Sequence, residues 1–161
     1  MKVVSKQRNS RMCYVCGMDN SEGLKVQFYN MEDGSVMTKF RYRTEHQSFP
    51  QRVHGGLIAT MFDELAFRAY WVKDDTMLGA TMSIDVKYRK PVPYEKDIIG
   101  KGIIVKDASR YFVAEAQLFD EDGVLLANST VNYIKLPIEK IADADFHEEM
   151  CYLIEDDVTE L

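Results

Sequence analysis

Residues 53–64 read Val-His-Gly-Gly-Leu-Ile-Ala-Thr-Met-Phe-Asp-Glu, so two glycines directly precede an apolar pattern with helical spacing. Beyond the glycines, apolar side chains recur every four residues in two adjacent rows, Leu57, Met61, Leu65 and Ala69 beside Ile58, Phe62, Ala66 and Tyr70. An apolar arc of this width predicts one long helix that is wrapped by a sheet.

The segments on either side of this helix have the alternating pattern of strands. Residues 24–29 and 36–42 flank the turn signal Asp33-Gly34 and predict a hairpin before the helix. After it, strands are expected at residues 76–90, 98–106, 111–119 and 124–135, with a tight turn at Asp122-Gly123. The last three are expected to run consecutively antiparallel. The pattern therefore predicts an α+β fold, an antiparallel sheet wrapped around one central helix.

The length of 161 residues suits a single domain, expected over residues 1–136. Residues 1–20 are expected to form an N-terminal extension, a short helix or loop containing Cys13 and Cys16. Residues 137–161 form an acidic tail: eight of the chain's 26 acids lie within 143–161, where Lys and Arg are absent. We expect this tail to be solvated or loosely docked. Residues 1–142 contain the other 18 acids and all 20 Lys and Arg residues, and this balance gives no support to nucleic-acid binding.

Membrane insertion and secretion also find no support. The chain has no apolar run near the roughly 20 residues that a membrane-spanning helix needs. Residues 1–8, Met-Lys-Val-Val-Ser-Lys-Gln-Arg, lack the apolar core of a secretory signal. We therefore expect a cytoplasmic protein without a membrane span.

The helix start combines backbone donors with a carboxylate further along. Peptide N–H groups at Gly55 and Gly56 are free of helical partners and lie at the positive end of the helix dipole, so they can bind a developing oxyanion. Asp63 is eight residues further on, about 12 Å along a straight helix. One small reacting group cannot contact both. If both act in one reaction, an antiparallel second copy must bring Asp63 toward the other Gly55, which predicts a two-fold dimer with two interfacial sites.

Here the sequence resembles the hotdog-fold acyl-CoA thioesterases, in the branch of phenylacetyl-CoA thioesterase-like proteins, whose sequences carry His-Gly-Gly followed by a helix with an Asp. The resemblance covers roughly residues 12–136. It includes Glu-His-Gln-Ser-Phe-Pro-Gln-Arg at 45–52, which is similar to the loop before the central helix. An N-terminal signature, Cys13-Tyr-Val-Cys16-Gly17 with Asn20, Gly23 and Leu24, and the strand end Tyr88-Arg-Lys-Pro-Val92 also match.

The resemblance implies a hotdog fold and hydrolysis of acyl-CoA thioesters. Gly55 or Gly56 would hold the thioester carbonyl oxygen, and Asp63 of the other subunit would be the general base or the nucleophile. His54 would position the site, although it could equally cap the helix start or bond loop carbonyls. CoA would be part of the substrate and no separate cofactor is implied. The basic run Lys87, Arg89 and Lys90 is suited to CoA phosphates, although exposed strands are often basic.

Three positions qualify this resemblance. Ser48 stands where relatives often have Asn or Gly, so its hydroxyl could orient a water. Gln51 stands where relatives with the Cys signature tend to have Gly, so the loop is expected to be stiffer or bulkier. Thr81 matches a position that carries a hydroxyl in some relatives, and it could bond the attacking water or Asp63. An ordinary β-branched strand residue explains Thr81 equally well.

Asp63 and Glu64 are expected to differ in role. Asp63 lies near the edge of the apolar arc, where a partly buried carboxylate costs free energy and suggests a function. Glu64 is four residues before Arg68, the spacing of an ordinary ion pair on a helix surface. His46 and His147 have no comparable context and are not expected to act in the site.

The cysteines invite a metal interpretation that the sequence does not support. Cys13 and Cys16 have ligand spacing, but a structural zinc site needs four ligands and no second pair appears at suitable spacing. We therefore expect no metal, and cysteines that pack as small apolar residues. A redox role for Cys13 and Cys16 remains open, and Cys151 is isolated in the acidic tail.

Two rival functions remain at this point. One is a non-catalytic acyl-CoA binding or sensing protein, which would bind the ligand without turnover. The other is a dehydratase or hydratase acting on the acyl chain. Such an enzyme in this fold needs a His and an acid in an arrangement different from that of His54 and Asp63. The acyl group, the choice between CoA and acyl-carrier protein, and the pairing of dimers into a homotetramer all stay open.

Overall fold

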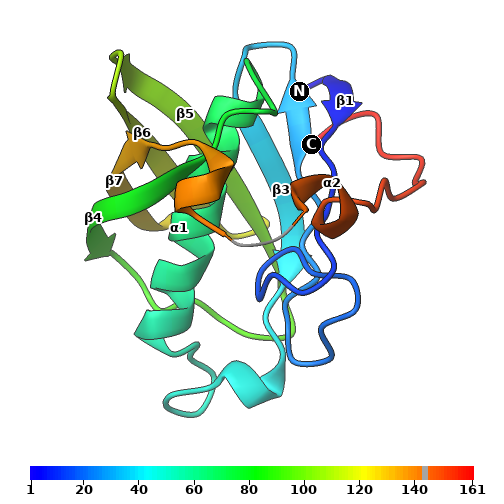
Figure 1. Ribbon diagram of the computed structural model, residues 1–161. Coiled ribbons are helices and arrows are strands. Elements are labelled where there is room, and N and C mark those ends of the chain that lie inside the picture. Colours follow the sequence, from blue (N-terminus) through cyan, green and yellow to red (C-terminus); the bar gives the residue numbers. More distant parts are fainter. Residues whose placement is uncertain (143–144) are drawn as a thin grey trace.

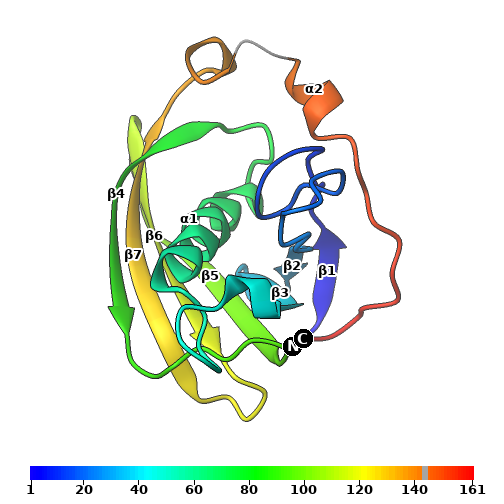
Figure 2. The same cartoon turned by 90° about the horizontal axis from the view of Figure 1, so that it is seen from below.

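One long helix, α1 (Gly55–Trp71), lies against a curved antiparallel sheet in the computed structural model, which describes residues 1–142 and 145–161 (Figures 1 and 2). In the described chain the sheet has seven strands in the order β1-β2-β3-β5-β6-β7-β4. The strands are β1 (Val3–Lys6), β2 (Tyr29–Met31), β3 (Val36–Arg41), β4 (Gly79–Tyr88), β5 (Asp97–Asp107), β6 (Tyr111–Phe119) and β7 (Leu125–Lys135). Short helical turns are Thr44–His46, Ile138–Lys140 and α2 (Phe146–Glu149). The predicted α+β hotdog architecture, a sheet wrapped around a central helix, is therefore confirmed.

Close contact between α1 and the sheet depends on two glycines of β5. A Cβ atom on Gly100 would lie 2.9 Å from a methyl carbon of Leu65, and one on Gly102 would lie 2.8 Å from the Leu65 backbone oxygen. A side chain at Gly100 would force the Leu65 side chain to shift, and one at Gly102 would collide with the backbone of α1, so glycine at these positions permits the close approach of the helix. Leu65 itself is fully buried, as the apolar pattern predicts.

The predicted strands after the helix are present, and β5, β6 and β7 pair consecutively antiparallel. The first hairpin is shorter than predicted, because β2 begins at Tyr29 and not at residue 24. Lys25 adopts φ 55°, a left-handed backbone that no extended strand can contain. The expectation of a helix or loop over residues 1–20 was also partly wrong, because Val3–Lys6 form β1 and pair with β2.

The acidic C-terminal segment is docked along the β1 edge of the sheet (Figure 2). The Val3 N–H donates to the Thr159 carbonyl over 2.8 Å, and Lys6 pairs with Asp156 over 2.7 Å. Apolar contacts of Val158 and Leu161 with the sheet add to these bonds. Of the eight acids of this segment, Asp143 lies outside the described residues. Nowhere in residues 1–142 and 145–161 is there a helix with the length and apolar character needed to cross a membrane.

Candidate active site

The start of α1 leaves one backbone donor free. His54 is the N-cap residue, and its Nδ1 atom accepts a hydrogen bond of 3.0 Å from the Gly56 N–H. This is the capping role that the sequence left open for His54, and it occupies the Gly56 donor. The Gly55 N–H has no acceptor among the described residues. Gly55 therefore presents the free N–H at the positive end of the helix dipole.

Asp63 lies partly buried in the middle of α1, at the edge of the apolar arc as predicted. The Thr81 hydroxyl on β4 donates a hydrogen bond of 2.6 Å to an Asp63 carboxylate oxygen. Burial raises the pKa of the Asp63 carboxyl, the Thr81 hydrogen bond opposes this shift, and the neighbouring Glu64 charge adds to it. Asp63 thus has the environment of a base whose proton affinity is increased by desolvation.

Two tyrosines that the sequence analysis did not single out secure the backbone around these groups. The Tyr133 hydroxyl donates to the Asp63 backbone oxygen over 2.5 Å, and Tyr133 is buried. The Tyr88 hydroxyl donates to the Gly55 carbonyl oxygen over 2.8 Å. Tyr88 lies in a motif of the resemblance, and that position was the only available sequence signal; Tyr133 reads as an ordinary inward residue of an alternating strand.

Strand β4 therefore contacts both Asp63 and Gly55, yet the two groups stay far apart within the chain. α1 is a regular helix from Gly55 to Trp71, so eight residues separate them by about 12 Å along its axis. Asp63 and the Gly55 N–H of one copy cannot contact the same carbonyl group. Any reaction that uses both needs groups from two copies.

The helix-facing side of β4 is incompletely covered. Tyr88, Ile84 and Thr81 stand opposite Ala127, Val131 and Tyr133 of β7, all three buried, so both sets share the inner face of the sheet. Nevertheless Ile84 is 37% exposed and Tyr88 is 54% exposed. The outer side of β4 is polar, with Ser83, Asp85 and Lys87. β4 is thus an edge strand with an apolar inner side open to solvent.

The predicted CoA-binding residues lie at the Gly55 end of the molecule. Lys87 is adjacent to Tyr88, which contacts Gly55, and Arg89 and Lys90 follow directly. All three side chains are exposed, and none pairs with a carboxylate in the described part of the chain. Arg89 donates to the Asn128 side chain over 3.0 Å.

The loop before α1 also lies at this end. Its base is closed by the pairing of Gln47 with Val53 and by a 2.9 Å bond from the Ser48 N–H to the Arg52 carbonyl. The structure gives Ser48 an exposed position and no contact with Asp63. Gln51 adopts φ 65°, the left-handed region where glycine is favoured, so the glycine that the resemblance implies for relatives would suit the backbone at this position.

The Glu64–Arg68 pair forms as predicted, but its location was predicted wrongly. Arg68 Nε lies 2.7 Å from Glu64 Oε1, and only 1% of the Arg68 side chain is exposed. Arg68 is therefore buried and Glu64 is partly buried, so the pair does not lie on an open helix surface. The N-terminal segment covers it: Arg68 also donates to the Arg8 carbonyl over 2.8 Å and to Cys16 Sγ over 2.9 Å. Four-residue spacing predicts the pair but carries no information about what packs over it.

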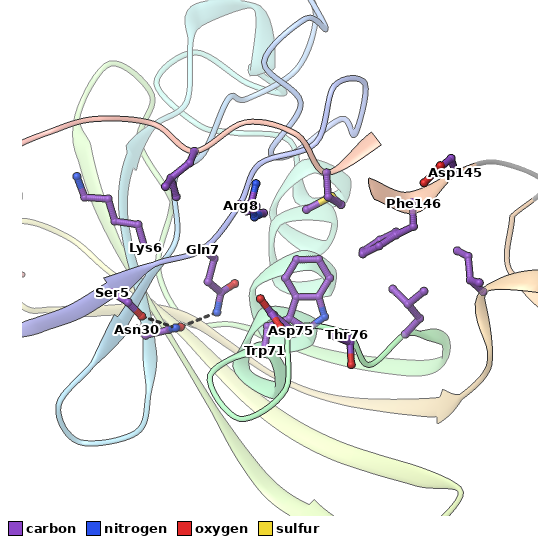
Figure 3. A pocket seen from close by; sticks show the side chains of 14 residues that line it. Ser5, Lys6, Gln7, Arg8, Asn30, Trp71, Asp75, Thr76, Asp145 and Phe146 are labelled. Carbon is purple, nitrogen blue, oxygen red and sulfur yellow. Dashed lines mark hydrogen bonds between the residues drawn. The ribbon is translucent and has the colours of Figure 1, made fainter. Parts of the chain in front are cut away.

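A cavity of about 880 Å³ lies elsewhere, between β1, the C-terminal end of α1 and the C-terminal segment (Figure 3). Its wall includes Trp71, Phe146 and the Asn30 amide, which is bonded to Gln7 over 2.7 Å. None of the predicted site residues lines it. The cavity is therefore separate from Asp63 and from the start of α1.

Comparison with known proteins finds similar proteins for part of this chain. Residues 51–127 match the family described as the thioesterase superfamily. Acyl-coenzyme A thioesterase THEM4 of Rattus norvegicus is 26% identical over 114 residues, which cover 70% of this chain and 48% of that protein. The chain thus spans about half the length of this curated relative.

Solved structures agree with the fold. One crystal structure of a thioesterase superfamily protein superposes with a TM-score of 0.69 at 22% identity, over 74% of this chain and 58% of that one. A hypothetical thioesterase protein with coenzyme A from Streptococcus pneumoniae superposes with a TM-score of 0.63 at 17% identity, over 70% of this chain and 86% of that one. These findings confirm the hotdog fold and the resemblance to the thioesterase superfamily.

Proposed function

We propose that this chain, which its fold and residues 51–127 connect to the thioesterase superfamily, hydrolyses acyl-CoA thioesters at two sites formed between two copies of itself. The observation that carries the proposal is the partly buried Asp63 carboxylate, oriented by Thr81, on the same helix as a free Gly55 N–H. These groups are a base or nucleophile and an oxyanion donor, the two elements that acyl transfer requires.

The second copy is inferred from β4. An edge strand with an apolar inner side exposed to solvent favours a partner that covers it, and a two-fold axis would place two copies of β4 and two copies of α1 together. In antiparallel α1 helices, Asp63 of the partner subunit can approach Gly55. Each dimer then holds two equivalent sites, and further pairing of dimers into a tetramer is compatible with the same interface.

Hydrolysis follows from these positions. The thioester carbonyl oxygen accepts a hydrogen bond from the Gly55 N–H, which stabilises the negative charge that develops on it. Asp63 of the partner subunit takes a proton from water, and the oxygen of that water attacks the carbonyl carbon. The carbon–sulfur bond then breaks, the CoA sulfur leaves and is protonated, and the free acid is released. Direct attack by the carboxylate, with an anhydride hydrolysed by water, uses the same contacts.

Substrate orientation is assigned to the basic run. Lys87, Arg89 and Lys90 lie beyond Tyr88 at the Gly55 end and have no carboxylate partners in the described chain, so their charge is available to CoA phosphates. His54 holds the loop and the Gly56 N–H in place, which leaves the Gly55 N–H as the proposed oxyanion donor. Ser48 receives no direct role.

The test is release of CoA thiol from short-chain, long-chain and aromatic acyl-CoAs by wild type, Asp63→Asn and Asp85→Asn. Asp85 is an exposed carboxylate on the outer side of β4 and is the matched control. We expect turnover by wild type and Asp85→Asn, and a loss of about 100-fold to 10,000-fold in Asp63→Asn. Ligand-induced thermal stabilisation without thiol release from any substrate would refute hydrolysis and identify an acyl-CoA binding protein. Acyl-chain hydration without thiol release would identify a hydratase.

A further inference from the structure

A second group of reactive side chains lies beside α1, outside the proposed active site. Cys13, Cys16 and Glu64 have their sulfur and carboxylate atoms within 4.8 Å of one another, and Arg68 contacts two of them. We call these four residues the dithiol cluster. The Cys13 thiol donates toward Glu64 Oε2 over 3.7 Å, and the Arg68 guanidinium donates to Cys16 Sγ over 2.9 Å.

Both thiols are carried by one tight turn. The Gly17 N–H donates to the Cys13 carbonyl over 2.7 Å, which closes the turn, and a Cβ atom on Gly17 would collide with that carbonyl oxygen. Glycine therefore makes the turn possible, and the turn keeps the two sulfur atoms on the same side. Cys16 is 1% exposed, whereas Cys13 is only partly buried. Only Cys13 is open to a reagent from solvent.

The charges of the cluster favour a thiolate. Arg68 is enclosed between the rings of Phe28 and Trp71, with its guanidinium carbon 5.0 and 4.3 Å from their centroids. A hydrogen bond from Cys13 and the positive charge of Arg68 lower the pKa of Cys16, although burial opposes this. The same hydrogen bond, together with burial and the Glu64 charge, raises the pKa of Cys13. The Arg68 contact therefore favours the ionised form of Cys16, whereas Cys13 keeps its proton.

The same contacts disfavour a metal ion in this cluster. Arg68 donates to Cys16 Sγ and to Glu64 Oε1, so one sulfur atom and one carboxylate oxygen of the cluster already contact a cation. A divalent ion would lie next to the buried guanidinium and be repelled by it. Three ligands are also one fewer than a closed structural zinc site uses.

We propose that Cys13 and Cys16 are a redox-active dithiol, oxidised by small-molecule disulfides to an intramolecular disulfide bond. The Cys13 thiol passes its proton to the neighbouring Cys16 thiolate, and the Cys13 thiolate so formed attacks the disulfide R–S–S–R, which forms Cys13–S–S–R and releases one RS⁻. That thiolate takes the proton from Cys16. The Cys16 thiolate then attacks the Cys13 sulfur and releases a second RS⁻, which water protonates. Two protein thiols lose two electrons, and one disulfide becomes two thiols.

Oxidation changes the surroundings of a buried charge. It removes the negative charge at Cys16, so Glu64 becomes the only anionic contact of Arg68 in the described chain. Arg68 also joins α1 to the N-terminal segment through the Arg8 carbonyl. The redox state of the pair is therefore expected to alter how firmly residues 7–17 are held against α1.

The experiment titrates the full chain in buffers of reduced and oxidised glutathione. Cys151 is exposed and would add an unrelated reactive thiol, so Cys151→Ser is the reference protein. We expect it to lose both remaining thiols in one two-electron step and to lose two hydrogen atoms in intact-mass spectra. In the Cys151→Ser background, Cys16→Ser should stop at a glutathione adduct on Cys13, and Cys13→Ser should stay largely unmodified because Cys16 is buried.

Contrary results are equally clear. If Cys151→Ser keeps both thiols in oxidised glutathione, while the unfolded protein in the same buffer forms the disulfide, the proposal is wrong. Stoichiometric zinc in purified Cys151→Ser, absent when Cys16→Ser is added, would replace it with a metal site. Circular dichroism of each variant establishes that the comparison is made on folded protein. None of these readouts depends on thioesterase activity.

Discussion

The Thr81 hydroxyl donates a 2.6 Å hydrogen bond to the Asp63 carboxylate and so connects the edge strand β4 to the middle of α1. The hydrogen bond joins two residues that are 18 positions apart in the sequence, at the carboxylate proposed as the base or nucleophile. Because the hydroxyl stabilises the ionised carboxylate, Thr81 adjusts the proton affinity of Asp63 as well as its orientation. We therefore regard Thr81 as a positioning residue, whose effect on the rate can be measured separately from that of Asp63.

Thr81→Val keeps the shape of the side chain and removes the hydroxyl. The Thr81 bond lowers the pKa of Asp63, so its loss raises that pKa, and the acid limb of kcat against pH should move to higher pH. Loss of one hydrogen bond also predicts a decrease of about fivefold in kcat at its plateau. Thr81→Ser should restore the wild-type profile. If the acid limb of Thr81→Val stays where it is in wild type, Thr81 does not influence the pKa of Asp63.

Asp63→Asn should be more stable than wild type at neutral pH. Burial raises the folded-state pKa of Asp63 above its unfolded value, so ionisation costs stability as pH rises through that range. Asn removes this cost and can still accept the Thr81 hydrogen bond. The melting temperature of Asp63→Asn should exceed that of wild type at pH 7. The difference should vanish below the usual carboxyl pKa, where Asp63 is protonated in both states. A variant less stable than wild type at pH 7 would contradict this.

Gly55→Pro tests the proposed oxyanion donor directly. Gly55 is the first residue of α1, where proline is tolerated, and His54 has an extended backbone (φ −64°, ψ 131°) that suits a residue before proline. The substitution therefore removes the N–H while the helix is retained. We expect kcat to fall by about 100-fold or more. Gly55→Ala keeps the N–H, and its Cβ would lie 3.4 Å from the Tyr88 hydroxyl, so it is the matched control. Equal losses in both would indicate crowding and not a lost donor.

Mixing two inactive variants tests whether each site uses two copies. In a heterodimer of Asp63→Asn with Gly55→Pro, one of the two sites combines an intact Gly55 with an intact Asp63. Random pairing makes half of the dimers mixed, so about a quarter of wild-type activity should return in the unfractionated mixture and about half in the purified mixed dimer. Co-expression with two affinity tags and assay of the doubly tagged dimer measures this. A doubly tagged dimer without activity would exclude a site shared in this way.

Much of the fold could be predicted because its signals are local. Four-residue apolar spacing specified α1, and alternation with turn signals specified β5, β6 and β7. The helix start at Gly55, capped by His54, is also a local feature of the chain. The strand predicted at residues 24–29 begins too early, because nothing in the residue pattern marks the left-handed backbone of Lys25. β1 was missed because a four-residue strand has too few residues to show a clear period.

Site residues divide in the same way. Asp63 and Gly55 could be proposed as site residues from the sequence, because a carboxylate at the edge of an apolar arc and a glycine at a helix start stand out without any partner. The Tyr88 contact with Gly55 depends on residues 33 positions apart and became visible only in three dimensions. Arg68 was assigned to the surface because the helix pattern shows its spacing to Glu64 but not the N-terminal segment that buries Arg68.

The amino-acid sequence by itself determined the central helix, the order of the strands after it and the candidate acid, since each follows from spacing along a few turns or one strand. Tertiary structure alone decided that Thr81 contacts Asp63, that the inner side of β4 stays open, and that Cys16 lies against a buried Arg68. These contacts arise where the curved sheet and the N-terminal segment close around α1. Folding brings together residues that are far apart in the sequence, and no regular spacing within a helix or a strand predicts such contacts.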